Sequence, residues 1–198
     1  CHAGDSTVHA PLSQRDPSIR LEVMTLRSLT LFVHVAGTLL LFSALALEWF
    51  ILAVIRAADA MPPLVSLRML GTLPPLTGVA ALLLLLSGMR LAGGGALRVP
   101  WIAVALAAML IMGVLGGTAL TPLRRSVQDP PDSRAEAIDA WRRYASTFFV
   151  HASLRMRVAA GLAVVYLMIG KPDLMTSAII VLLAMAAGAV SAVTRSRA

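Results

Sequence analysis

Long apolar segments constrain this chain more than any other feature of its sequence. The first runs from Leu29 to Ile55, 27 residues whose only ionisable side chains are His34 and Glu48. About 20 apolar residues in an α-helix cross the roughly 30 Å hydrocarbon core of a bilayer. Inside that core a helix satisfies every backbone amide within its own segment. The segment therefore predicts a transmembrane helix with some tilt or overhang.

The composition agrees with a lipid environment. Hydrophobic residues make up 58% of the 198 residues, charged residues 14%, and the mean hydropathy is +0.82. A soluble domain carries about 25% charged residues. The lipid bilayer is therefore the predicted partner. The net charge of +7 comes mostly from arginines placed between apolar runs, without the aromatic and basic interleaving of single-strand binding proteins. Nucleic acid is excluded as a partner on that ground.

The remaining apolar runs complete a predicted all-α fold, a polytopic transmembrane helix bundle of about five spans. The stretch 154–193 has 40 residues, about twice what one crossing needs. The sequence Lys171-Pro172-Asp173 near its centre predicts a reversal. A four-span fold with a re-entrant segment there is the alternative. The predicted spans are 29–55, 69–89, 99–120, 154–170 and 174–193.

Two motifs lie inside these spans. Pro74-Pro75 predicts either a kink in the second span or its true first turn. Gly113 and Gly117 form a GxxxG pair, which lets another backbone approach closely. Packing against another helix of this chain is favoured for that pair over dimerisation.

The loop 121–153 is the longest polar segment between spans. After Pro130-Pro131, the sequence Ser133-Arg-Ala-Glu136 has the spacing of a capping box. Apolar residues then recur at helical spacing, which predicts a short amphipathic helix in the loop between the third and fourth spans. The helix lies either on the membrane surface or on the end of the bundle as a lid.

Charge placement predicts how the bundle, residues 29–198, is oriented. Residues 1–28 are expected to form a polar, mobile N-terminal extension. With five spans, 11 Arg residues fall on the side that includes the C-terminus, and 6 Arg and Lys residues fall on the other side. The positive-inside rule then places the N-terminus outside and the C-terminus in the cytoplasm.

Glu48 is the one acidic residue within a predicted span. An ionisable group at this depth is costly to bury and is a functional candidate by default. One hypothesis is a proton or cation site. The favoured hypothesis is an ion pair with Arg68, Arg155 or Arg157, all of which are assigned to the same side of the membrane.

His34 is the candidate cofactor ligand, for haem or copper, although a hydrogen bond to a neighbouring helix is the more common role for such a histidine. His151 is the candidate second haem ligand, but the predicted topology places it near the opposite face. Two axial nitrogens must lie about 4 Å apart, so one haem cannot use both. His2 and His9 form no recognised metal site, and the sole cysteine, Cys1, allows no internal disulfide. No metal site is predicted.

Motifs for soluble catalysis are missing from the sequence. It contains no GxGxxG after a strand, no Walker loop, no HExxH, no GxSxG and no CxxC. Ser43, Ser87 and Thr118 lie within spans, where small hydroxyl residues usually form hydrogen bonds between helices. No catalytic residue is predicted, and an enzyme is disfavoured.

Three segments carry a resemblance to an uncharacterised family of small bacterial multi-pass membrane proteins: LTLFVHVAGTLLLFSALALEWF, LLSGMRLAGG and YLMIGKPDLMTSAII. The chain is also loosely similar to copper-resistance D-type membrane domains, which share an early helix with a histidine. The resemblance implies a bacterial plasma membrane, and it transfers no functional residue.

Three functions remain open at this point. The favoured one is a non-enzymatic structural or accessory protein that binds other membrane subunits or a second copy of itself. A small transporter is the second, and it predicts a polar cavity from Pro74, Pro75 and Thr77 to Glu48. The third is a haem- or copper-linked redox protein that uses His34.

Overall fold

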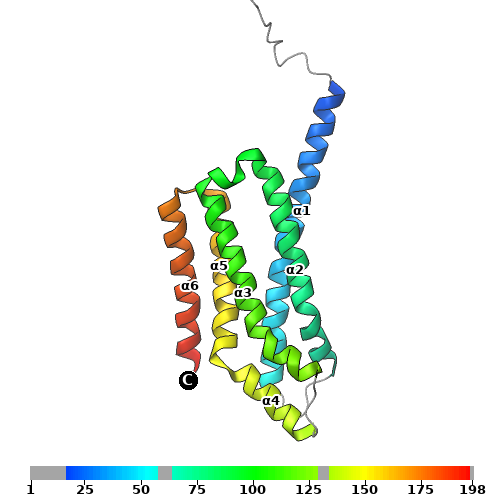
Figure 1. The fold of residues 1–198 in the computed structure, drawn as a ribbon, viewed down its shortest axis with the longest axis vertical. Helices are drawn as coiled ribbons and strands as arrows, with labels where there is room; N and C mark the ends of the chain where they lie inside the picture. The colour runs from blue at the N-terminus through cyan, green and yellow to red at the C-terminus, as the bar shows by residue number, and fades with distance from the viewer. Residues whose placement is uncertain (1–16, 58–63, 129–133, 197–198) are drawn as a thin grey trace, which may run out of the picture.

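The computed structural model describes residues 17–57, 64–128 and 134–196, and these residues form helices without a strand. The predicted all-α bundle is confirmed (Figure 1). The elements are α1 (Pro17–Ala57), α2 (Leu64–Ala92), the 3₁₀ helix η2 (Gly93–Arg98), α3 (Pro100–Gln128), α4 (Arg134–Ser146), α5 (Phe148–Gly170) and α6 (Leu174–Ser196).

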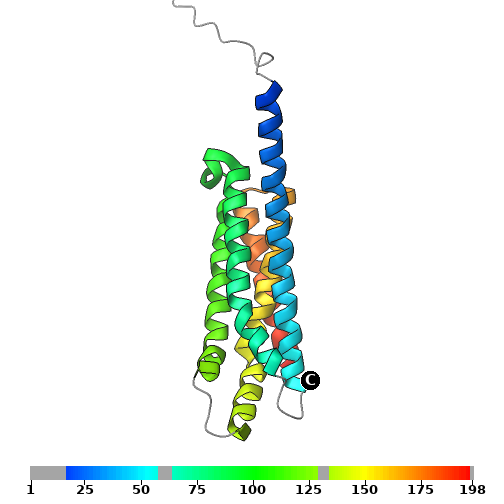
Figure 2. The same cartoon turned by 90° about the vertical axis from the view of Figure 1, so that its right-hand side faces the viewer.

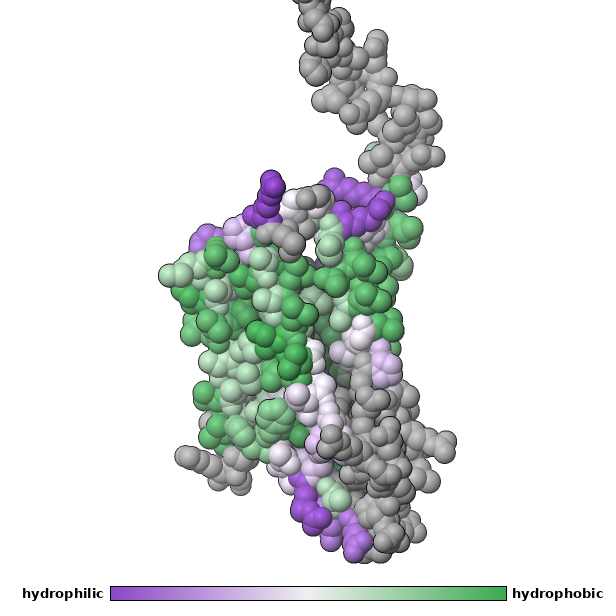
Figure 3. Space-filling model, viewed as in Figure 1, coloured by the Kyte–Doolittle hydropathy of each residue, from purple (hydrophilic) through white to green (hydrophobic). Residues whose placement is uncertain are grey.

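Five of these helices are long and apolar enough to cross a membrane. Their outward surfaces are apolar: Leu110, Ile169 and Met175 each expose more than 70% of their area. Figure 3 shows a hydrophobic belt with hydrophilic residues toward both ends of the bundle. Because such a belt would be unstable in water, the chain is a membrane protein. The spans are Met24–Arg56, Pro75–Ala92, Pro100–Ala119, Phe148–Gly170 and Leu174–Val193.

The helices pack as two pairs joined by α3. α1 packs along α2, α5 packs along α6, and α3 contacts α2, α5 and α6 (Figures 1 and 2). The core takes residues from all six α-helices. Leu45, Leu52 and Ile55 of α1 and Leu154 and Leu167 of α5 are almost fully buried in it. Polar side chains of α1, α2, α5 and α6 are also buried in the interior of the bundle: Glu48, Ser87, Ser153, Arg157 and Ser177.

The predicted reversal at Lys171-Pro172-Asp173 joins α5 to α6. Lys171 adopts a left-handed conformation (φ 45°), and its N–H donates to the Leu167 carbonyl at 2.9 Å, which closes α5. Asp173 then caps α6, because its carboxylate accepts from the Thr176 N–H at 3.1 Å and from the Thr176 hydroxyl at 2.7 Å. The hydroxyl bond is the main reason that the pKa of Asp173 lies below its ordinary value.

Three helix boundaries differ from the predicted ones. α1 begins at Pro17, before the expected start at Leu29. α5 begins at Phe148, because Thr147 is extended and serves as its N-cap, so Arg155 and Arg157 lie inside a full-length helix. α2 continues through Pro74-Pro75 as one helix, and its apolar span begins at Pro75.

The predicted amphipathic helix is α4, which lies across one end of the bundle (Figure 1). It packs against α1, α3 and α5, and Ala145 on its inner face is fully buried. α4 is thus a lid on the bundle end, the second of the two predicted placements. Ser133 of the capping box lies outside the described residues.

Candidate functional site

A buried ion pair joins α1 to α5. Nη2 of Arg157 lies 2.5 Å from Oε1 of Glu48, and the two side chains are only 3% and 2% exposed. Arg157 is therefore the partner of Glu48 among the three predicted arginines. These residues are 109 positions apart in the sequence. The pair exists only because α1 and α5 lie side by side.

Gly116 of α3 makes room for the guanidinium group. A Cβ at this position would lie 2.9 Å from Nη1 of Arg157, closer than real Cβ atoms come to another atom. Nε of Arg157 is also buried, and it has no hydrogen-bond partner among the described residues. The guanidinium is thus held between the Glu48 carboxylate and the bare backbone of α3.

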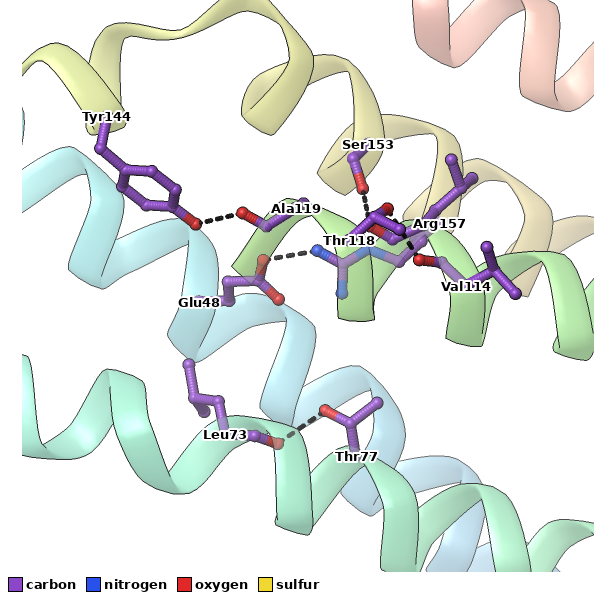
Figure 4. Close-up of polar contacts among 10 residues, drawn as sticks. Glu48, Leu73, Thr77, Val114, Thr118, Ala119, Tyr144, Ser153 and Arg157 are labelled. Atoms are coloured by element: carbon purple, nitrogen blue, oxygen red, sulfur yellow. Dashed lines mark hydrogen bonds and ion pairs between the residues drawn. The ribbon is translucent and has the colours of Figure 1, made fainter. Parts of the chain in front are cut away.

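Two further side chains bond to backbone carbonyls of α3 beside Gly116. The Ser153 hydroxyl of α5 donates to the Leu115 carbonyl at 2.9 Å, and the Tyr144 hydroxyl of α4 donates to the Ala119 carbonyl at 2.7 Å (Figure 4). We call Glu48, Gly116, Tyr144, Ser153 and Arg157 the polar cluster.

Tyr144 remains a hydrogen-bond donor in this setting. Burial, and next the nearby Glu48 carboxylate, raise the pKa of its phenol above the ordinary value. The hydroxyl therefore stays protonated at physiological pH. It ties the lid helix α4 to α3 over the buried ion pair.

The polar cluster is suited to holding helices together. Each charge in it faces an opposite charge, and the carboxylate has almost no exposed surface. Removing one member of a buried ion pair leaves an uncompensated charge and costs about 3–5 kcal/mol. The cluster thus connects α1, α3, α4 and α5 in a specific arrangement.

Arg155 points to a different part of the bundle. Its guanidinium lies 5.4 Å from the centre of the Trp49 ring, and it donates to the Ser191 carbonyl of α6. Its backbone carbonyl is 2.8 Å from where a Cβ on Gly188 would lie, so α5 and α6 nearly touch there. The side chain of Arg68, the third predicted partner, lies outside the described residues.

His34 forms a hydrogen bond between α1 and α2. Its Nδ1 lies 3.0 Å from Oγ of Ser87. The Ser87 hydroxyl has one hydrogen, which it donates to the Leu83 carbonyl of its own helix. Nδ1 must then donate to Ser87, and in a neutral ring Nε2 keeps its lone pair.

The described residues line a partly open cavity of about 590 Å³ beside His34, between α1, α2, α3 and α5. Its lining is mostly apolar, with Thr38 and His34 as polar exceptions inside the span of α1. Glu48 and Thr77 do not line it, so it is not the polar cavity that the transporter hypothesis predicts. Four flexible thioether side chains line it: Met89, Met109, Met112 and Met168.

His151 lies far from this cavity. Its Nε2 forms a 2.7 Å hydrogen bond with the Ala145 carbonyl where α4 meets α5. His34, by contrast, contacts the C-terminal half of α2, at the other end of the bundle (Figure 1). One haem could not be bound by both. Among the described residues no group of three His, Cys, Asp or Glu side chains is placed to hold a metal ion. His2 and His9 lie outside the described part of the chain.

The glycines that matter for packing are not the predicted GxxxG pair. Gly113 and Gly117 are exposed, and a Cβ on either would meet nothing within 4 Å, so the prediction of intramolecular packing is wrong. Gly116, one position away, faces Arg157. In the sequence, the adjacent Gly116 and Gly117 indicate that one face of α3 can be approached closely. Only the rotation of α3 about its axis decides which of the two glycines packs against another helix.

Comparisons with protein-family models, with curated proteins and with solved structures find no match to this chain. The resemblance to small bacterial membrane proteins therefore stays a prediction. It assigns no role to any residue of the polar cluster or of the cavity.

Proposed function

We propose that this chain is a non-enzymatic structural or accessory subunit of the bacterial plasma membrane. The observation that supports it most is the ion pair of Glu48 and Arg157. The acidic residue buried in a span is paired and covered by α1, α3 and α5, where it stabilises the bundle. Transport of a cation or proton would require access to this carboxylate.

An outward surface of α3 is the proposed partner surface. Gly113 and Gly117 leave the backbone bare there, and the neighbouring Leu110 and Val114 are 73% and 65% exposed. Small residues at this spacing allow a second transmembrane helix to approach closely. The occupant is another membrane subunit or a second copy of this chain.

The proposed orientation has the N-terminus outside and the C-terminus in the cytoplasm. Five of the counted charges lie inside spans: Arg27, Arg56, Arg90, Arg155 and Arg157. Without them, eight arginines remain on the C-terminal side against four Arg and Lys residues on the other. The charge bias keeps its direction.

Two experiments test the structural role. In proteoliposomes the protein should produce no proton, Na⁺ or K⁺ flux above that of empty liposomes. A flux that Glu48→Gln abolishes would contradict the proposal and favour the transporter. A photo-crosslinking residue at 113 or 117 should give a protein adduct in native membranes. The same residue at 182, an exposed position on α6, is the matched control.

A second candidate is a haem- or copper-linked protein, because His34 lines a cavity and its Nε2 is available as a ligand. An absorption spectrum of the protein purified in detergent tests it. A Soret band, or bound copper, that is lost in His34→Ala would support this candidate.

A further inference from the structure

The cavity beside His34 has the properties of a small-molecule site. At about 590 Å³ it falls within the usual range for ligand pockets, roughly 300–1,000 Å³. Such pockets are mainly apolar with a few placed polar groups, and here apolar side chains surround His34. The cavity is also lined by Lys171 and Val99, which lie at the end of the bundle nearest the start of α1. It therefore extends from His34 toward the membrane surface.

The contacts of His34 specify what the cavity offers to a ligand. The Ser87 oxygen accepts a hydrogen bond from Nδ1–H, so the proton of the neutral ring is on Nδ1. The Nδ1–Cε1 side of the ring lies against α2, since a Cβ on Gly88 would come within 3.4 Å of Cε1. Nε2 is then the nitrogen left for the cavity, and it is a hydrogen-bond acceptor. A ligand must supply a donor to match it.

The rest of the lining indicates the body of the ligand. Four methionines and the aromatic rings of Phe42 and Trp101 surround the space. Thioether sulfurs make favourable contacts with aromatic rings and adapt to irregular shapes. Thr38 adds little polarity, because its hydroxyl donates to the His34 carbonyl of its own helix. An apolar molecule with an aromatic ring fits this surface.

From these contacts we infer that the cavity binds a lipophilic phenol or quinol, whose hydroxyl donates a hydrogen bond to Nε2 of His34. The ring lies among the methionines, and an apolar tail lies along the leucine and valine side chains of the lining. This site is separate from the polar cluster and does not depend on the proposed accessory role. No chemical step is required of the bound molecule.

The test uses decylubiquinol and its dimethyl ether with the full chain in detergent under anaerobic conditions. The ether keeps the ring and the tail but has no hydroxyl hydrogen. Binding is followed through quenching of tryptophan fluorescence, with Trp101→Phe to identify the reporter. We expect the quinol to bind about tenfold more tightly than the ether, the effect of one buried hydrogen bond. Equal affinities would overturn the inference without the need for any variant.

Variants then locate the site. His34→Leu should remove the difference between quinol and ether, and Leu106→Trp, which fills the cavity, should weaken both ligands. Thr30→Val is the matched control, because Thr30 lies on α1 outside the cavity and should leave both affinities unchanged. A quinol preference that survives His34→Leu, or a Soret band in the purified protein, would refute the assignment.

Discussion

The guanidinium of Arg157 lies between the carboxylate of Glu48 and the bare backbone of Gly116, so three helices meet at one charged contact. Glu48 comes from α1, Arg157 from α5 and Gly116 from α3. In the interior of a membrane protein, neither charge would be tolerated without the other. The stability of the bundle should therefore depend on the two charges as a pair.

A double-mutant cycle tests this dependence. Glu48→Gln and Arg157→Met should each lower the stability by about 3–5 kcal/mol, because each leaves the opposite charge buried and unpaired. The double variant should be less destabilised than the sum of the two, since no unpaired charge remains. Stability is measured by steric trapping or thermal unfolding in detergent. Additive effects would show that the two side chains do not interact.

Gly116 and Gly117 give a matched pair of substitutions on neighbouring positions. Gly116→Ala should destabilise the bundle by about 1–3 kcal/mol, since the new Cβ would displace the Arg157 guanidinium. Gly117→Ala should change stability by less than about 1 kcal/mol, because its Cβ meets open space. Thermal unfolding of both variants in detergent makes the comparison. If both glycines tolerate alanine equally, α3 is rotated relative to the structure described above.

Tyr144→Phe should loosen the lid helix α4. The change removes the 2.7 Å hydrogen bond to the Ala119 carbonyl but keeps the ring in place, at a cost of about 1 kcal/mol. Amide hydrogen exchange should become faster in α4 and remain unchanged in α6, which does not contact α4. Unaltered exchange in α4 would mean that the bond does not hold the lid.

The cap of α6 should be sensitive to acid. Hydrogen bonds from Thr176 lower the pKa of Asp173, so the ionised carboxylate stabilises the folded state. This contribution is fully present above the ordinary carboxyl pKa of 3.8 and is lost as the pH falls through the lower folded value. Asp173→Ala should therefore unfold at a lower temperature than the native protein at neutral pH, and the difference should vanish in acid. A difference that persists unchanged at acidic pH would exclude the carboxylate as its source.

The sequence by itself determined the architecture. Each apolar segment must satisfy its backbone amides within its own helix, whatever its neighbours are. The five spans and the amphipathic helix could therefore be predicted one segment at a time. The reversal at Lys171-Pro172-Asp173 could also be predicted from nearby residues alone, because the Asp173 carboxylate that caps α6 bonds to Thr176, three residues away.

Only the tertiary structure decided which side chains meet. Three arginines were candidates for Glu48, and the choice of Arg157 followed from α5 lying beside α1 with Gly116 opposite. Arg155 lies two residues before Arg157 on α5, on nearly the opposite face of the helix, and its guanidinium lies over the Trp49 ring instead. Likewise, the rotation of α3 placed Gly116 inward and Gly117 outward. A long apolar segment indicates that a helix crosses the membrane. Lipid and the protein interior are almost equally apolar, so the segment does not specify which face of the helix packs against which neighbour.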